Sequence, residues 1–129
     1  MDKKSYYKFL FFIGAAWNIL ASISFILTSI YNLSAFPAYG IAVPISMIWL
    51  QSFLFLVANL GIGYLIVSMD ISKNHGIVII GVIAKLGYFI ICVIYLLIGD
   101  IGVLTLLFAS VDVVFSILFI EFLINYKKL

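Results

Sequence analysis

The sequence has few charged residues and a single cysteine, and each shortage excludes a class of protein. Charged residues make up 9% of the 129 residues, whereas hydrophobic residues make up 67%. So short a chain could not bury that much apolar surface in water, which excludes a soluble globular domain. The formal net charge of +2 is too small to indicate nucleic-acid binding. Cys92 has no second cysteine for a disulfide or a cysteine metal site, and we expect it to be a small buried hydrophobe.

Long apolar runs take the place of the missing charge. A helix needs about 20 apolar residues to cross a bilayer core of about 30 Å. Four windows have this length, at about 9–31, 46–68, 76–98 and 102–124. They must be helices, because four strands cannot close a barrel and lipid offers the backbone no hydrogen-bond partners. The short connectors favour antiparallel neighbours. The sequence therefore predicts an all-α membrane protein, an antiparallel bundle of four transmembrane helices that forms one domain over residues 1–129.

The lysines outside the windows indicate the orientation of these helices. They lie before the first window, between the second and third, or after the fourth, and the other two connectors contain none. The six are Lys3, Lys4, Lys8, Lys73, Lys127 and Lys128. The positive-inside rule then places both termini in the cytoplasm. The basic start and apolar run also resemble a signal peptide, but the run lasts about 23 residues without a clear cleavage site, so we expect a retained first helix.

Each predicted helix has one polar side chain close to its midpoint. These are Asn18, Asn59, Lys85 and Asp112, each within about two residues of the midpoint, or about 3 Å along the axis. The tight turn at 99–100 provides a separate check, because Lys85 lies about 14 residues before it and Asp112 about 12 after it. These counts put the two charges at nearly equal depth on neighbouring helices. The sequence predicts a polar layer at the bilayer midplane, with Lys85 paired to Asp112.

This layer has two main interpretations. An isolated charge at the bilayer centre costs about 3 kcal/mol, and ionisable groups at that depth commonly mark functional sites. The layer would then serve transport or binding of an ion or a lipophilic small molecule, with Trp17 and Tyr88 as further lining residues. Alternatively, Lys85, Asp112 and the two asparagines only determine which helices meet. The chain would then be a structural or accessory membrane subunit.

An intramembrane enzyme is a third interpretation. A carboxylate beside a lysine suffices for acid–base chemistry on a lipid-soluble substrate, and a Schiff base on Lys85 with Asp112 as counter-ion is a variant of this idea. The sequence shows no nucleophile–base set, phosphate loop or metal cluster, so we predict no cofactor and no metal. His75 lies in a connector, where we expect it to be solvated. The partners we expect are the lipid bilayer and a homo-oligomer, because four short helices leave little room for a solute path.

Four fragments share a pattern with known sequences. They are "AAWN" in the first window, "GIGY" in the second, "SMDISKNHGIVIIGVIAK" across the second connector, and "DVVFSILF" in the fourth. Together they resemble a group of small four-span bacterial membrane proteins that have no assigned activity. The resemblance covers most of the chain. It implies four helices, a bacterial inner-membrane location, and a shared pattern that includes Lys85 and Asp112, and it implies no activity.

Overall fold

The computed structural model describes residues 2–129, so Met1 of the predicted domain lies outside the described residues. Within them the chain is helical, and four helices are long and apolar enough to cross a membrane. These are α1 (Lys3–Tyr31), α2 (Met47–Met69), α3 (His75–Leu97) and α4 (Val103–Asn125), with the 3-10 helices η1 (Leu33–Tyr39) and η2 (Tyr126–Lys128). The bounds of α2, α3 and α4 agree with the predicted windows to within one residue. The prediction of four apolar helices is confirmed.

The first helix begins at Lys3 rather than at residue 9 because Asp2 caps it. The Asp2 carboxylate accepts a hydrogen bond of 2.7 Å from the Ser5 backbone N–H, which satisfies one of the free donors in the first turn. The same hydrogen bond lowers the pKa of Asp2. As a result, the basic residues at the start of the chain belong to the helix itself.

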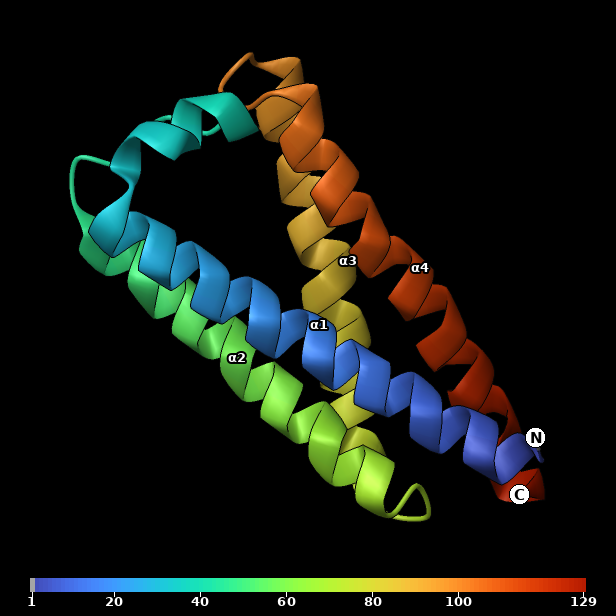
Figure 1. Cartoon of the computed structure of the whole chain (residues 1–129). Coiled ribbons are helices and arrows are strands. Elements are labelled where there is room, and N and C mark those ends of the chain that lie inside the picture. Colours follow the sequence, from blue (N-terminus) through green and yellow to red (C-terminus); the bar gives the residue numbers. More distant parts are fainter. Residues whose placement is uncertain (1) are drawn as a thin grey trace.

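The four helices form two antiparallel hairpins, α1–α2 and α3–α4 (Figure 1). Within each hairpin the helices pack along one another, and glycine permits this in the first. A Cβ on Gly61 would lie 2.7 Å from Ile19 and 3.1 Å from the Ala15 carbonyl oxygen, so a larger residue would push α1 and α2 apart. The two hairpins meet at the end of the molecule that holds both termini and diverge toward the other end (Figure 1).

Aromatic side chains fill the end of the molecule that holds the termini. The ring centroid of Phe11 in α1 lies 4.7 Å from that of Phe119 and 4.9 Å from that of Phe122, both in α4. The Tyr64 ring of α2 lies 5.0 Å from the Phe119 ring. We call these four residues, together with Tyr7, the aromatic core. All five are buried. Ring pairs of this kind add about 1 kcal/mol each beyond the area they bury, so packed rings hold the hairpins together here.

His75 is not solvated as expected. Its ring is partly buried and lies 4.0 Å from the Tyr126 ring, and its Nε2 atom lies 2.9 Å from the Ile71 carbonyl oxygen. The ring also lies beside Phe122. The reason for the difference is that the α2–α3 connector packs against the end of α4. The Phe122 and Tyr126 rings there cover His75 at the start of α3.

At the opposite end, η1 connects the two hairpins. Figure 1 shows it crossing from the end of α1 to the turn between α3 and α4. Gly40, directly after η1, has a φ of 74°, and its carbonyl oxygen accepts the Gly102 N–H at 2.9 Å. A Cβ on Gly40 would lie 2.8 Å from the Gly102 Cα, so glycine is needed both for the conformation and for the close approach. The Thr105 hydroxyl also donates to the Tyr39 carbonyl oxygen at 2.8 Å.

Large apolar side chains cover the outer surface of all four helices. They include Leu20, Phe55, Ile83 and Ile117, each of which is more than half exposed. A soluble protein does not leave so much of its helical surface apolar, whereas lipid solvates it without cost. Together with the length of the helices, this surface identifies an integral membrane protein.

Candidate functional site

The predicted pairing of Lys85 with Asp112 is present in the structure. The Lys85 ammonium donates to Asp112 Oδ1 and also donates to Asn18 Oδ1 at 3.0 Å. We call these three residues the polar cluster. Lys85 and Asn18 are 4% and 3% exposed, which means that α3, α4 and α1 meet around a charge removed from solvent and lipid. The helix lengths put the cluster near mid-depth, as the turn at 99–100 predicts.

Two aromatic rings cover another side of the Lys85 ammonium. Its nitrogen lies 5.7 Å from the Tyr64 ring centroid and 5.3 Å from that of Phe115. A cation this close to a ring face gains about 0.5–2 kcal/mol, depending on how far it is desolvated. Gly81 makes this arrangement possible, since a Cβ there would overlap the Tyr64 ring. The lysine therefore has compensating contacts on several sides, although it lies in an apolar region.

Some polar atoms near the cluster remain without a partner. Asp112 Oδ1 accepts from Lys85, but no side chain or backbone group within residues 2–129 donates to Asp112 Oδ2. The Asp112 side chain is 16% exposed. Ser22, one helical turn beyond Asn18, is fully buried, and its hydroxyl has no hydrogen-bond partner in the described part of the chain. An unpaired polar group in an apolar environment is costly, and of these atoms only Asp112 Oδ2 belongs to a partly exposed side chain, so it marks the place where a further group can bind.

A cavity of about 320 Å³ reaches the polar cluster from between the hairpins. All four helices contribute to it, and it is lined mainly by aromatic and aliphatic side chains such as Phe53 and Leu60, with the polar cluster and Ser22 in its wall. A second cavity of about 530 Å³ lies between α1, α4 and the end of η1. Trp17, Ala21, Phe25 and Phe108 line both cavities, so the two are adjacent.

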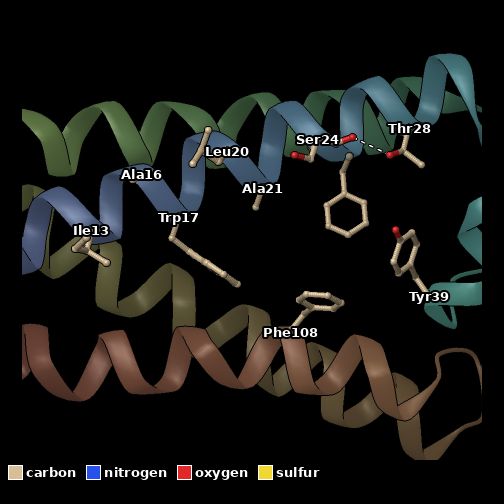
Figure 2. Close-up of a pocket in the computed structure, with 10 residues that line it drawn as sticks. Ile13, Ala16, Trp17, Leu20, Ala21, Ser24, Thr28, Tyr39 and Phe108 are labelled. Atoms are coloured by element: carbon tan, nitrogen blue, oxygen red, sulfur yellow. Dashed lines mark hydrogen bonds between the residues drawn. The ribbon is translucent and has the colours of Figure 1, made fainter.

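Figure 2 shows the second cavity from the side of α1 and α4. The Trp17 ring of α1 and the Phe108 ring of α4 point into the space between these helices, and Tyr39 lies toward one end. The Thr28 hydroxyl donates to the Ser24 carbonyl oxygen at 2.8 Å, so this group is already satisfied. The second cavity is therefore a mainly apolar space without a charged side chain, and it adjoins the first cavity, which has Lys85 and Asp112 in its wall.

Most of the predicted site residues come together, and one does not. Asn18, Lys85 and Asp112 form the cluster, and Trp17 and Tyr88 line the cavity beside it. Asn59 requires a correction, because its side chain is exposed on the outer face of α2. The face of α2 that meets α1 contains Gly61, two residues further along, and two residues rotate a helix by more than half a turn. The depth of Asn59 agrees with the layer, but its direction does not.

Sequence reasoning did not assign Tyr64, Phe25 and Phe53 to the site. Tyr64 carries one signal in the sequence, because it is a tyrosine within an apolar helix, whereas its position opposite Gly81 of α3 is visible only in the structure. Phe25 and Phe53 have no such signal, since exposed and cavity-lining phenylalanines look alike in an apolar sequence. Ser22 was recognisable only as a small residue on the face of Asn18.

The chemistry available in the cavity is limited to hydrogen bonding and charge. No group of three or more His, Cys, Asp or Glu side chains within residues 2–129 is placed to hold a metal ion. The cavity has an ammonium, a carboxylate and an amide in its wall, of which the Asp112 carboxylate is the most exposed, and the rest of the lining is mainly apolar. This combination suits recognition of a mainly apolar molecule with a small polar part.

Comparisons of the chain with protein-family models, curated proteins and solved structures gave no match. The function has to be inferred from the site.

Proposed function

We propose that this integral membrane protein binds a lipophilic small molecule in the cavity between its hairpins. The observation that carries the proposal is the cavity of about 320 Å³ that ends at Lys85 and Asp112. Its size falls in the range of about 300–1,000 Å³ that is typical of small-molecule sites. A tightly packed bundle without such a cavity would instead have supported a purely structural polar layer.

The walls of the cavity favour a lipophilic ligand over a hydrated ion. Apolar and aromatic side chains make up most of the lining, and the polar groups gather on one part of the wall. An ion would need polar contacts along a path across the membrane, whereas the aromatic core occupies the end beyond the cluster. Transport of the same ligand would require the aromatic core to separate, so binding is the function that we propose first.

The proposal includes an orientation and a location. The termini and the α2–α3 connector lie at the same end of the molecule (Figure 1), and this end bears all six lysines outside the polar cluster. The positive-inside rule supports cytoplasmic termini, and with the resemblance to small bacterial proteins it supports the inner membrane. Reporter fusions at the C-terminus test the orientation, because a reporter active only in the periplasm should stay inactive there.

The test of binding compares two substitutions of the same kind. The protein is extracted in mild detergent, and native mass spectrometry records any small molecule that remains bound. Asp112→Asn should lose this adduct, because the amide cannot balance the Lys85 charge. Asp100→Asn, in the exposed α3–α4 turn, should keep it. Circular dichroism should show the same helix content for both. An adduct that Asp112→Asn retains, or a wild-type protein without any adduct, would contradict the proposal.

A second candidate is an accessory membrane subunit. Asn59 favours it, because this polar side chain lies exposed at mid-depth, where lipid offers it no hydrogen-bond partner and a second chain would. Membrane hydrogen bonds of this type contribute about 0.6 kcal/mol on average, so the contact would select a partner rather than hold it strongly. The partner can be a second copy, as in a homo-oligomer.

Two variants separate the candidates. Asn59→Leu should weaken a complex, measured by cross-linking in membranes, if the accessory function is correct. The double variant Lys85→Leu/Asp112→Leu should then retain the complex and the activity of the partner. If ligand binding is the function, the double variant should fold and lose the bound molecule, while Asn59→Leu keeps it.

A further inference from the structure

We infer that the ligand is an uncharged amphiphile with a hydroxyl head and one hydrocarbon tail, which enters from the lipid between α1 and α4. This inference rests on the proposed function and adds the class of ligand and its route. The hydroxyl would lie at Asp112 Oδ2 and the tail would lie in the larger, apolar cavity.

The free hydrogen-bonding capacity of the cavity calls for a donor in the head. Lys85 already donates to Asn18 and Asp112, and the rings of Tyr64 and Phe115 cover another of its sides. Asp112 Oδ2 is the carboxylate oxygen that no group of residues 2–129 donates to, and the side chain is partly open to the cavity. A hydroxyl hydrogen satisfies this oxygen.

The charge of the cluster excludes most charged heads. Lys85 and Asp112 balance each other, so the site has no net charge before a ligand binds. A carboxylate or phosphate head would place a second anion beside Asp112, and a quaternary ammonium has no hydrogen to donate. Either head would also leave a net charge in an apolar environment, which is strongly unfavourable. A hydroxyl is free of both costs.

The arrangement of the two cavities indicates where the tail lies. The larger cavity is lined mainly by apolar side chains and by no charged one, and it lies between α1 and α4 (Figure 2). Trp17 and Phe108 line both cavities, so a molecule whose head reaches Asp112 extends past these rings. The aromatic core closes the terminal end, and η1 crosses the other. The lateral opening toward lipid is therefore the route that the structure supports.

Trp17 makes this inference testable. The chain contains two tryptophans, and Trp49→Phe leaves Trp17 as the fluorophore at the cavity. The protein is reconstituted in phosphatidylcholine nanodiscs and titrated with a bromine-tagged long-chain alcohol, which quenches a tryptophan that it contacts. Two further probes carry the same tagged chain, one with a carboxylate head and one with a quaternary ammonium head. Trp17→Phe with Trp49 intact reports the nonspecific quenching caused by probe dissolved in lipid.

The alcohol should quench Trp17 saturably, with a half-saturation concentration about tenfold or more below those of the other two probes. Ala21→Phe should remove the saturable part by filling the passage between the cavities. Ile23→Phe, on the exposed outer face of the same helix, should leave it unchanged. Asp112→Asn should reverse the order of the probes, because Lys85 then lacks its counter-ion and attracts the carboxylate. A residue with only a structural role would not produce this reversal.

The outcomes separate the inference from the proposed function. Equal saturable quenching by all three heads, abolished by Ala21→Phe, would overturn the ligand class and leave the binding site standing. Saturable quenching that Ala21→Phe does not affect would overturn the lateral route. Absence of saturable quenching with every probe would overturn both the inference and the proposed function. If Asp112→Asn does not fold, the comparison of Ala21→Phe with Ile23→Phe still tests the lateral route, and the comparison of the three probes on the wild-type site still tests the ligand class.

Discussion

The two ends of the molecule have similar apolar compositions and different packing. At the terminal end, Phe11, Phe119 and Phe122 interlock and are fully buried. Toward η1, Phe25 and Phe108 meet edge to face with a longer distance of 6.5 Å between ring centroids, and both line the cavities. The difference shows that apolarity alone does not determine packing in a membrane protein. What differs is the separation of the hairpins, which small residues set at one end and η1 sets at the other.

The polar cluster lies at the boundary between these regions. On one side, Lys85 faces the rings of Tyr64 and Phe115, and Tyr64 belongs to the aromatic core. On the other side, it faces the cavity. A charge at this boundary can be held by packed rings and still be reached by a ligand. The comparison of the two ends leads to four predictions.

The largest effect should come from removing a core ring. Phe119→Ala leaves a void between Phe11 and Tyr64, and the free energy of unfolding should fall by about 3–5 kcal/mol. Phe108→Ala, in the same helix but 41% exposed, should cost less than about 1.5 kcal/mol. Unfolding in mixed micelles with increasing SDS measures both. Equal losses would show that the cavity region is as tightly packed as the aromatic core.

The next effect concerns the glycines of α3. A Cβ on Gly81 overlaps the Tyr64 ring, so Gly81→Ala should lower the unfolding free energy by about 1–3 kcal/mol and move the ring away from Lys85. Gly87→Ala is the matched control, because no atom lies within 4 Å of its added Cβ. This variant should be unchanged or more stable, by at most about 1 kcal/mol. The same SDS titration measures both, and a similar loss in both variants would contradict the role of close approach.

A smaller effect should come from Gly40 at the open end. In Gly40→Ala the alanine must adopt a left-handed φ and its Cβ would overlap the Gly102 backbone. The free energy of unfolding should fall by about 1–2 kcal/mol. The Gly102 amide, which donates to Gly40, should exchange with deuterium faster. Gly99→Ala has a similar φ of 86° without a nearby atom, so it should cost about 1 kcal/mol and leave that amide protected. Unchanged exchange in Gly40→Ala would show that this contact does not hold the hairpins.

The smallest effect belongs to Asp70 in the α2–α3 connector. Hydrogen bonds from the Ser72 hydroxyl and backbone, together with Lys73 at 3.2 Å, lower the pKa of Asp70 to about 2. A carboxyl with a lowered pKa stabilises the fold above its usual pKa, and the contribution disappears as the pH falls toward 2. Amide exchange in the connector should therefore rise only in that acidic range. Ser72→Ala should move the NMR titration midpoint of Asp70 upward, and an unchanged midpoint would contradict this assignment.

The sequence predicts the helices and the depth of the polar residues better than it predicts their directions. Apolar length and the turn at 99–100 suffice to pair Lys85 with Asp112, because one short hairpin determines their relative height. Asn59 shows where this reasoning fails. The second helix is apolar on every side, so no polar stripe indicates which face meets α1. The sequence pattern also does not predict the cavity, because the cavity depends on how far apart the two hairpins lie.

The position of Lys85 and Asp112 in one hairpin has a consequence for biogenesis. The two residues are joined by the short α3–α4 turn, so they can neutralise each other while that hairpin enters the bilayer from the ribosome. Asn18, from the other hairpin, can add its contact after the two have met. If the two helices of this hairpin enter the bilayer together, the lysine is paired from the start, although its third partner, Asn18, belongs to the hairpin that is synthesised first.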